Sequence, residues 1–289
     1  MLAFALAALA LCLAQEPSPR SAVPAGADSP LRVLFVGNSY TYGNDVPWMV
    51  RGLAAAEKGA RPLEVESIAI GGATLRNHVE SGAVAEKLAT GRFEVLVLQE
   101  QSQLPLLDRA AFHAAVRELH ATAAKTSTRV VFFCTWARRD HPEQRAGLEE
   151  AYAEIAAELG ATMAPVGRAF ERHAALAKRA GSKREQTPVA GNAASAPLSL
   201  YAEDGSHAAP CGSYLAAALL LEAIQGRPAR ALARELPARR DPALPTGTPT
   251  PPPLIALDEA QAALLARCVR EAREGFAKER AGRRAKAPS

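Results

Sequence analysis

The stretch Val33-Leu34-Phe35-Val36-Gly37-Asn38-Ser39-Tyr40-Thr41 decides the fold class that we predict for this chain. Its first four residues form an unbroken apolar run, which is typical of a central parallel strand buried on both faces. The run ends abruptly in Gly-Asn-Ser, so Ser39 stands at the carboxyl end of the strand, just before a helix expected at residues 46–58. Ligands bind at that edge of an open α/β sheet. The stretch therefore predicts a serine at the ligand-binding edge of a parallel sheet.

The rest of the chain alternates between strand and helix patterns. Apolar runs predict four further strands, at residues 63–70, 94–98, 129–135 and 161–166. Longer patterns with helical spacing predict helices at residues 79–89, 108–125, 142–159, 167–179, 210–224 and 258–278. Such alternation produces right-handed βαβ units and a parallel sheet. We therefore expect an α/β protein, a flavodoxin-like three-layer α/β/α sandwich with a central parallel sheet of about five strands.

The chain has 289 residues, of which 48% are hydrophobic, enough for one medium-sized domain with a true core. We place this domain at residues 31–278. The segments expected to lie outside its regular structure are a flexible lead-in at 15–30, a loop insertion at 181–197, a Pro-rich connection at 241–253 and a basic tail at 279–289.

Residues 1–14 are almost wholly Ala and Leu and are followed by a polar Gln-Glu-Pro segment, a pattern typical of a signal peptide. A bilayer span needs ~20 apolar residues, so we expect export to the periplasm or the extracellular space, with no stable membrane span after cleavage. Cys12 fits a lipid-attachment site poorly, because Leu11 stands where a small residue is usual.

Composition also limits the partners. The formal net charge of +4 is spread along the chain, and no basic motif is interleaved with aromatic residues, so we predict no nucleic-acid binding. Cys134, Cys211 and Cys268 are widely separated and lack metal-ligand spacing, and we predict no metal and no other cofactor. A bridge between Cys211 and Cys268 is left open, because an exported protein meets an oxidising compartment.

A second short segment, Asp204-Gly205-Ser206-His207, supplies the partners that a reactive serine needs. In nucleophilic acyl transfer the His takes the proton of the Ser hydroxyl, and the Asp orients the imidazole and stabilises the imidazolium. Gly71-Gly72 and Gln99-Glu100-Gln101-Ser102 follow two other predicted strands. The carboxyl ends of parallel strands meet at one edge, so we expect all these segments to converge there.

With these residues in place, the sequence resembles the SGNH hydrolase superfamily of GDSL-like esterases and lipases. Gly37-Asn38-Ser39 corresponds to the first block of that family, with Asn in place of Asp, and Asp204 to His207 corresponds to its last block. The resemblance implies that Ser39 is the nucleophile, His207 the base and Asp204 its orienting partner. It also implies that the backbone N–H groups of Ser39 and Gly72 bind the oxyanion.

The third block departs from the family pattern. Typical members carry Gly-x-Asn-Asp, whose Asn donates to the oxyanion, whereas this chain has Gln99-Glu100-Gln101-Ser102, closer to the Gln-x-x-Ser pattern of carbohydrate acetylesterases. We predict Gln99 as the donor, with Gln101 as the rival. The rim of the substrate site is expected to include Tyr40, Gln101 and Arg138.

We therefore predict an exported serine esterase that hydrolyses a small acyl ester, such as an O-acetyl group on a carbohydrate, by way of an acyl-enzyme. Its partner would be a small-molecule or carbohydrate ester. Taken alone, Ser39 is better interpreted as a residue that caps a turn. The alternative function is that of a non-catalytic carbohydrate-binding protein on the same scaffold. The sequence leaves open the natural ester, hydrolysis against acyl transfer, and the oligomeric state.

Overall fold

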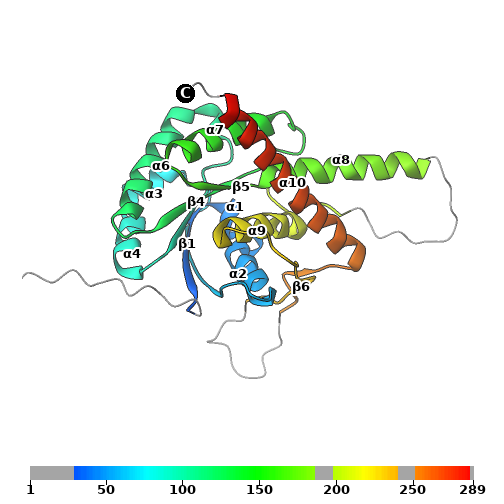
Figure 1. Ribbon diagram of the computed structural model, residues 1–289, viewed down its shortest axis with the longest axis horizontal. Coiled ribbons are helices and arrows are strands. Elements are labelled where there is room, and N and C mark those ends of the chain that lie inside the picture. The colour runs from blue at the N-terminus through cyan, green and yellow to red at the C-terminus, as the bar shows by residue number, and fades with distance from the viewer. Residues whose placement is uncertain (1–28, 186–197, 240–250, 287–289) are drawn as a thin grey trace, which may run out of the picture.

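The structure is a computed structural model that describes residues 29–185, 198–239 and 251–286. Its centre is a five-stranded parallel sheet in the order β2-β1-β3-β4-β5, with helices on both faces (Figure 1). The strands are β1 (Leu31–Gly37), β2 (Leu63–Ala69), β3 (Val95–Leu98), β4 (Arg129–Cys134) and β5 (Thr162–Pro165). A separate antiparallel pair joins β6 (Glu235–Leu236) and β7 (Ile255–Ala256). The predicted three-layer sandwich is confirmed.

Alternate residues of each central strand point to opposite faces, and each face has its own core. Val33 and Phe35 of β1 pack with helices α2 (Val46–Ala56), α8 (Val166–Glu185), α9 (Pro210–Gln225) and α10 (Glu259–Lys286). Leu34 and Val36 face the other layer, formed by α3 (Leu75–Ser81), α4 (Ala83–Gly91), α6 (Arg109–Ala124) and α7 (Gln144–Glu158). All four side chains are fully buried. The unalternated apolar run of β1 is thus explained by burial on both faces.

Three short helical segments lie near the carboxyl edge of the sheet. They are α1 (Ser39–Tyr42) and the 3-10 turn η1 (Gly43–Asp45), which follow β1, and α5 (Leu104–Leu107), which follows β3. The sequence analysis expected only loops there. Segments of three or four residues are too short for a periodic pattern, so their helical turns cannot be detected from hydrophobic spacing.

The other differences concern helix ends. The single helix expected at 79–89 is two helices, because Gly82 adopts a left-handed φ of +70° between α3 and α4. The start of α3 is fixed by a capping box in which Thr74 and Asn77 satisfy each other's backbone N–H groups. Helix α8 continues through residues 181–185, expected to be loop, and α10 continues to Lys286, through most of the expected basic tail.

The expected signal peptide with Cys12, nearly all of the lead-in, and most of the loop insertion and the Pro-rich connection lie outside the described residues. Within the described ranges, no helix combines the length and the apolar character needed to cross a membrane. Cys134, Cys211 and Cys268 are free thiols, so the bridge that the sequence left open between Cys211 and Cys268 is not formed.

Candidate active site

Ser39 is the first residue of α1, immediately after β1. The side chain of Asn38 caps this helix by accepting the N–H of Tyr40 at 3.1 Å. Gly37 is required before it, because a Cβ there would lie 2.4 Å from Oγ1 of Thr41 and 2.5 Å from Oε1 of Gln99. The turn between strand and helix is therefore crowded on its inner side and leaves the Ser39 side chain half-buried at the sheet edge.

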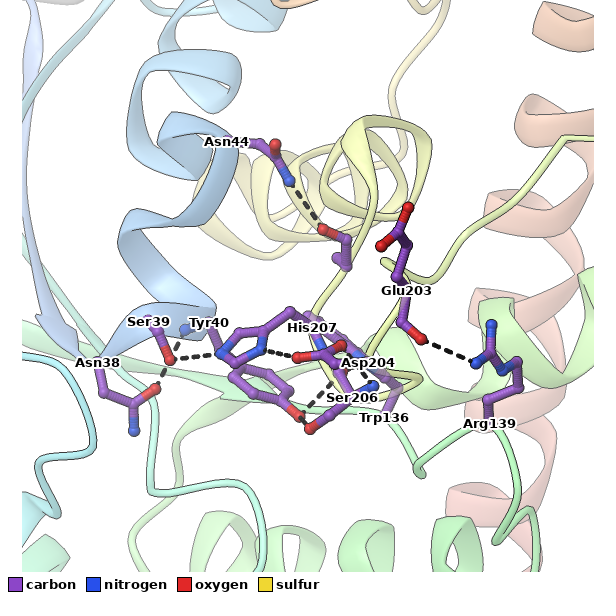
Figure 2. Close-up of polar contacts among 11 residues, drawn as sticks. Asn38, Ser39, Tyr40, Asn44, Trp136, Arg139, Glu203, Asp204, Ser206 and His207 are labelled. Carbon is purple, nitrogen blue, oxygen red and sulfur yellow. Dashed lines mark hydrogen bonds and ion pairs between the residues drawn. The ribbon is translucent and has the colours of Figure 1, made fainter.

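Ser39, His207 and Asp204 form a continuous hydrogen-bonded chain (Figure 2). Oγ of Ser39 lies 2.8 Å from Nε2 of His207, and Nδ1 of the same ring lies 2.5 Å from Oδ2 of Asp204. Because the carboxylate accepts a hydrogen bond from Nδ1, the ring carries its proton on that nitrogen. Nε2 is then free to accept a hydrogen bond from the Ser39 hydroxyl. The structure thus brings together the three residues that sequence analysis selected, across 168 positions of chain between Ser39 and His207.

Asp204 is strongly held as a carboxylate. Its Oδ1 accepts the backbone N–H groups of Ser206 and His207, each at 2.9 Å. The hydrogen bond from the His207 side chain, together with these backbone bonds, lowers the pKa of Asp204 to about 2. The carboxylate is therefore charged across the whole neutral range and supplies the negative partner that an imidazolium needs.

Two aromatic side chains, those of Tyr40 and Trp136, hold the turn that carries Asp204 and His207 by hydrogen bonds. The hydroxyl of Tyr40 donates to the carbonyl of Ser206 at 2.9 Å, and the indole N–H of Trp136 donates to the same carbonyl at 2.9 Å. The rings of Tyr40 and Trp136 stack with centroids 4.7 Å apart. Arg139 adds a backbone bond to the Gly205 carbonyl at 2.8 Å. Figure 2 shows Tyr40 and Trp136 beside Ser206, and the Arg139 side chain reaching the Glu203 carbonyl.

This packing corrects the expectation for Tyr40. A rim residue must reach the substrate, but Tyr40 is only 6% exposed and its hydroxyl is engaged with Ser206. The aromatic residue that does face solvent is Tyr42, two residues on, which is 50% exposed. The sequence showed both tyrosines beside Ser39, but their orientations depend on Trp136, which lies far away in sequence.

The expectation for Gln99 also needs correction. Its amide N–H groups donate to Oδ1 of Asn38 at 3.0 Å and to the carbonyl of Glu100 at 2.5 Å. Its Oε1 accepts from the Asn38 backbone and from the Thr41 hydroxyl. The side chain is fully buried. Both amide hydrogens are used inside the protein, so none is left for a substrate oxygen, and Gln99 braces the turn before Ser39.

Gln101, the alternative candidate for the oxyanion donor, has a different environment from Gln99. Its Oε1 accepts the backbone N–H groups of Gln103 and Leu104, which leaves its amide nitrogen without a protein partner in the described structure. Gly72 has a left-handed φ of +71°, a conformation that glycine adopts at no steric cost. Among the described residues, the backbone N–H groups of Ser39 and Gly72 also make no hydrogen bond. Three uncommitted donors thus come from the loops after β1, β2 and β3.

The remaining residues at this edge are exposed. Arg138 lies in the loop after β4, and its guanidinium makes no hydrogen bond or ion pair with the described residues. Ile70, which the sequence analysis assigned only to a strand, is 56% exposed beside Gly71. A Cβ built on Gly71 would be 3.2 Å from the hydroxyl of Tyr42, so Tyr42 lies against this loop. In the described ranges, no group of three or more His, Cys, Asp or Glu residues is arranged to hold a metal ion.

Comparison with known proteins agrees with this geometry. No family model and no curated protein matches the sequence. Among solved structures, a protein from Slackia heliotrinireducens assigned to the SGNH hydrolases matches with a TM-score of 0.53 and 29% sequence identity, over 68% of this chain and all of that chain. The fold of this chain is that of the SGNH hydrolases. The predicted resemblance, and with it the prediction of an SGNH-type enzyme acting on ester bonds, is confirmed.

Other solved structures match this chain with lower TM-scores. TesA matches with a TM-score of 0.48 and 16% identity over 68% of this chain and 98% of its own. A catalytic mutant of the acetylxylan esterase Axe2 from Geobacillus stearothermophilus matches with a TM-score of 0.47 and 16% identity over 68% of this chain and 95% of its own. These scores add nothing to the assignment of individual residues, which depends on the geometry above.

Proposed function

We propose that this protein is an exported serine esterase that removes small acyl groups, with O-acetyl groups on carbohydrates as the first substrate class. The observation that carries the proposal is the 2.8 Å contact between Oγ of Ser39 and Nε2 of His207, in a ring held by Asp204. A serine that only capped a turn would not need a histidine oriented by a carboxylate on its hydroxyl. Export rests on the apolar segment at residues 1–14.

The reaction follows from these positions. His207 Nε2 accepts the Ser39 proton as Oγ bonds to the ester carbonyl carbon, and the carbonyl oxygen becomes an oxyanion. When the tetrahedral intermediate collapses, the alcohol leaves with the proton held on His207, and the acyl group remains on Ser39. Water then attacks the acyl-enzyme, giving its proton to His207, and the acid is released as Ser39 regains its hydrogen.

The oxyanion would be bound by donors from three loops. We assign the backbone N–H groups of Ser39 and Gly72 and the side-chain amide of Gln101, because these groups have no acceptor within the described structure. One such donor typically contributes 10²–10³-fold in kcat. Gln101 therefore replaces Gln99 in our account of the third block.

The surface beside Ser39 supports a carbohydrate ester. Tyr42 and Ile70 present exposed apolar surface in the loops after β1 and β2, and Arg138 offers free donors after β4. Sugar rings have apolar faces that rest on aromatic rings and hydroxyls that accept from guanidinium groups. The Gln-containing third block, which resembles that of carbohydrate acetylesterases, points to the same class.

The test is hydrolysis of two ester series by the full-length protein: p-nitrophenyl esters of increasing acyl length, and acetylated sugars with release of acetate. We expect acetate esters to be cleaved fastest and Ser39→Ala to lose at least about 10³-fold in kcat. Ser81→Ala is the matched control, since that hydroxyl binds a carbonyl within α3. Sugar binding without Ser39-dependent hydrolysis would instead favour the non-catalytic carbohydrate-binding alternative.

A further inference from the structure

Glu100 is a charged residue type in a fully buried position, two residues after the end of β3 and between the two glutamines of the third block. Burial of a carboxyl group is costly unless hydrogen bonds or an opposite charge compensate for it. The mechanism above gives Glu100 no role. Its contacts show which parts of the site this side chain connects.

One oxygen of Glu100 joins two loops of the site. Its Oε1 accepts the backbone N–H of Leu75 at 3.0 Å and the backbone N–H of Gln101 at 2.6 Å. Leu75 lies three residues after Gly72, so the two bonds connect the segment of one proposed oxyanion donor to the residue that supplies another. The Glu100 backbone N–H is in turn fixed by the hydroxyl of Tyr152 on α7, at 2.9 Å.

The second carboxyl oxygen, Oε2, is buried and has no hydrogen-bond partner. No cation compensates the group among the described residues, and burial raises the pKa of Glu100 to about 7. The nearby titratable groups are neutral: burial raises the pKa of Tyr152 and of Cys134 on β4 well above their ordinary values. On α3, burial lowers the pKa of His78, whose Nε2 lies 2.8 Å from the Gly37 carbonyl.

We propose that Glu100 is a positioning residue that ties the Gly72 loop to Gln101 and acts with its carboxyl group protonated. This inference rests on the proposed esterase function. When Glu100 ionises, a buried negative charge appears behind two loops whose donors must bind a developing oxyanion. A charge that is buried from water is poorly screened and repels a nearby like charge, so ionisation of Glu100 weakens oxyanion binding. The enzyme should therefore lose activity as the pH rises through neutrality.

The experiment is the pH profile of kcat and KM for a soluble acetate ester, measured with wild type, Glu100→Gln and Glu100→Ala. Gln is the isosteric neutral substitute, since its carbonyl oxygen can still accept from Leu75 and Gln101. We expect the wild-type kcat to decline with an apparent midpoint near pH 7. The decline should disappear in Glu100→Gln, which keeps kcat within several-fold at low pH. Relative to wild type at low pH, Glu100→Ala should have a kcat lower by roughly 10–100-fold and no decline near pH 7, with a smaller change in KM.

Two further measurements distinguish a failure of the Glu100 proposal from a failure of the proposed esterase function. The exposed Glu80→Gln on α3 is the matched control and should leave the profile unchanged. Amide hydrogen exchange over residues 72–75 and 99–101 should accelerate in Glu100→Ala if Glu100 connects these two segments. This readout does not require the protein to turn over a substrate. Ser39-dependent hydrolysis with an unaltered profile in folded Glu100→Gln would overturn the Glu100 proposal alone. No hydrolysis of any ester would overturn the proposed function, and Glu100's role in it.

Discussion

Asp204 holds His207 by both of its carboxyl oxygens: Oδ2 lies 2.5 Å from the ring Nδ1, and Oδ1 accepts the backbone N–H of His207 at 2.9 Å. One carboxylate therefore fixes the imidazole and the backbone that carries it. This double contact is local, because it joins two residues that are three positions apart in the sequence. The position of the ring relative to Ser39 depends on the packing of the domain.

A dependence of stability on pH follows from the first contact. The pKa of Asp204 is lowered from 3.8 to about 2 in the folded protein, so its stabilising contribution is complete above pH 4 and is lost as the pH falls to 2. The difference in unfolding free energy between wild type and Asp204→Asn should thus shrink over that interval. Asp204 is half-exposed, so we expect about 1 kcal/mol or less at pH 7, measured by urea unfolding. A difference that grows in acid would contradict this account.

The second expectation concerns the aromatic support of the turn. Tyr40→Phe removes one donor to the Ser206 carbonyl and keeps the phenyl ring, whereas Trp136→Phe removes the other donor and also replaces the buried indole with a smaller ring. Because the turn then positions His207 less well, we expect kcat to fall about tenfold and KM to change little in both variants. The free energy of unfolding should fall by about 1 kcal/mol in Tyr40→Phe and by more in Trp136→Phe. Steady-state kinetics and urea unfolding measure these effects.

Tyr201→Phe is the matched control for that pair. It removes a similar hydroxyl bond, to the carbonyl of Ala137 rather than to a residue of the turn. It should cost about as much stability as Tyr40→Phe and leave kcat unchanged. Equal losses of kcat in all three variants would show that the support is general rather than specific to His207.

Asn38 is the residue at which this chain departs from the usual Gly-Asp-Ser motif, and substituting it tests the role of the asparagine. Its Nδ2 donates to the carbonyl of Ala73 at 2.9 Å, and the side chain is 2% exposed. Asn38→Asp places a carboxylate oxygen against that carbonyl, so we expect a loss of about 1–3 kcal/mol at pH 7 and a smaller loss in acid, where a protonated Asp can donate. Thermal unfolding across pH checks this, and an unchanged Tm at pH 7 would count against the assigned bond.

Substitutions of Gln99 and Gln101 should have different main effects: the first on the stability of the protein, the second on its turnover. Gln99→Ala leaves the buried Asn38 N–H and Thr41 hydroxyl without an acceptor, so unfolding should become easier by about 1–3 kcal/mol. Gln101→Ala removes an amide whose nitrogen is uncommitted and whose oxygen accepts the N–H groups of Gln103 and Leu104, so it should cost on the order of 10²–10³ in kcat besides some stability. Circular dichroism melts and initial rates on both variants distinguish the roles. The opposite pattern would restore Gln99 as the donor.

The sequence was sufficient to predict the fold because strand ends are marked by local changes in composition. The apolar run of β1 stops at Gly37, and those of β3 and β4 stop in polar or aromatic residues, so the loops at the carboxyl edge could be listed before their positions were known. Parallel topology then placed Ser39, Gly72 and His207 at the same edge.

Side-chain direction at those loops could not be predicted. Gln99 contacts Asn38, 61 residues away, and Tyr40 contacts Ser206, 166 residues away. Whether such a residue turns inward or toward the substrate depends on which distant donors and acceptors meet it, and no local pattern records this. The same reason explains why Glu100, polar in sequence, was not recognised as buried.

The most direct test of the central claim is covalent labelling with a fluorophosphonate, which forms a phosphorus–oxygen bond with an activated serine as fluoride leaves. Intact mass and peptide mapping should show one adduct per chain, on Ser39. The adduct should be absent in Ser39→Ala and form at least about 10³-fold more slowly in His207→Ala, because the hydroxyl then lacks its base. Labelling of another serine, or equal rates in wild type and His207→Ala, would contradict the assignment of Ser39 as a nucleophile activated by His207.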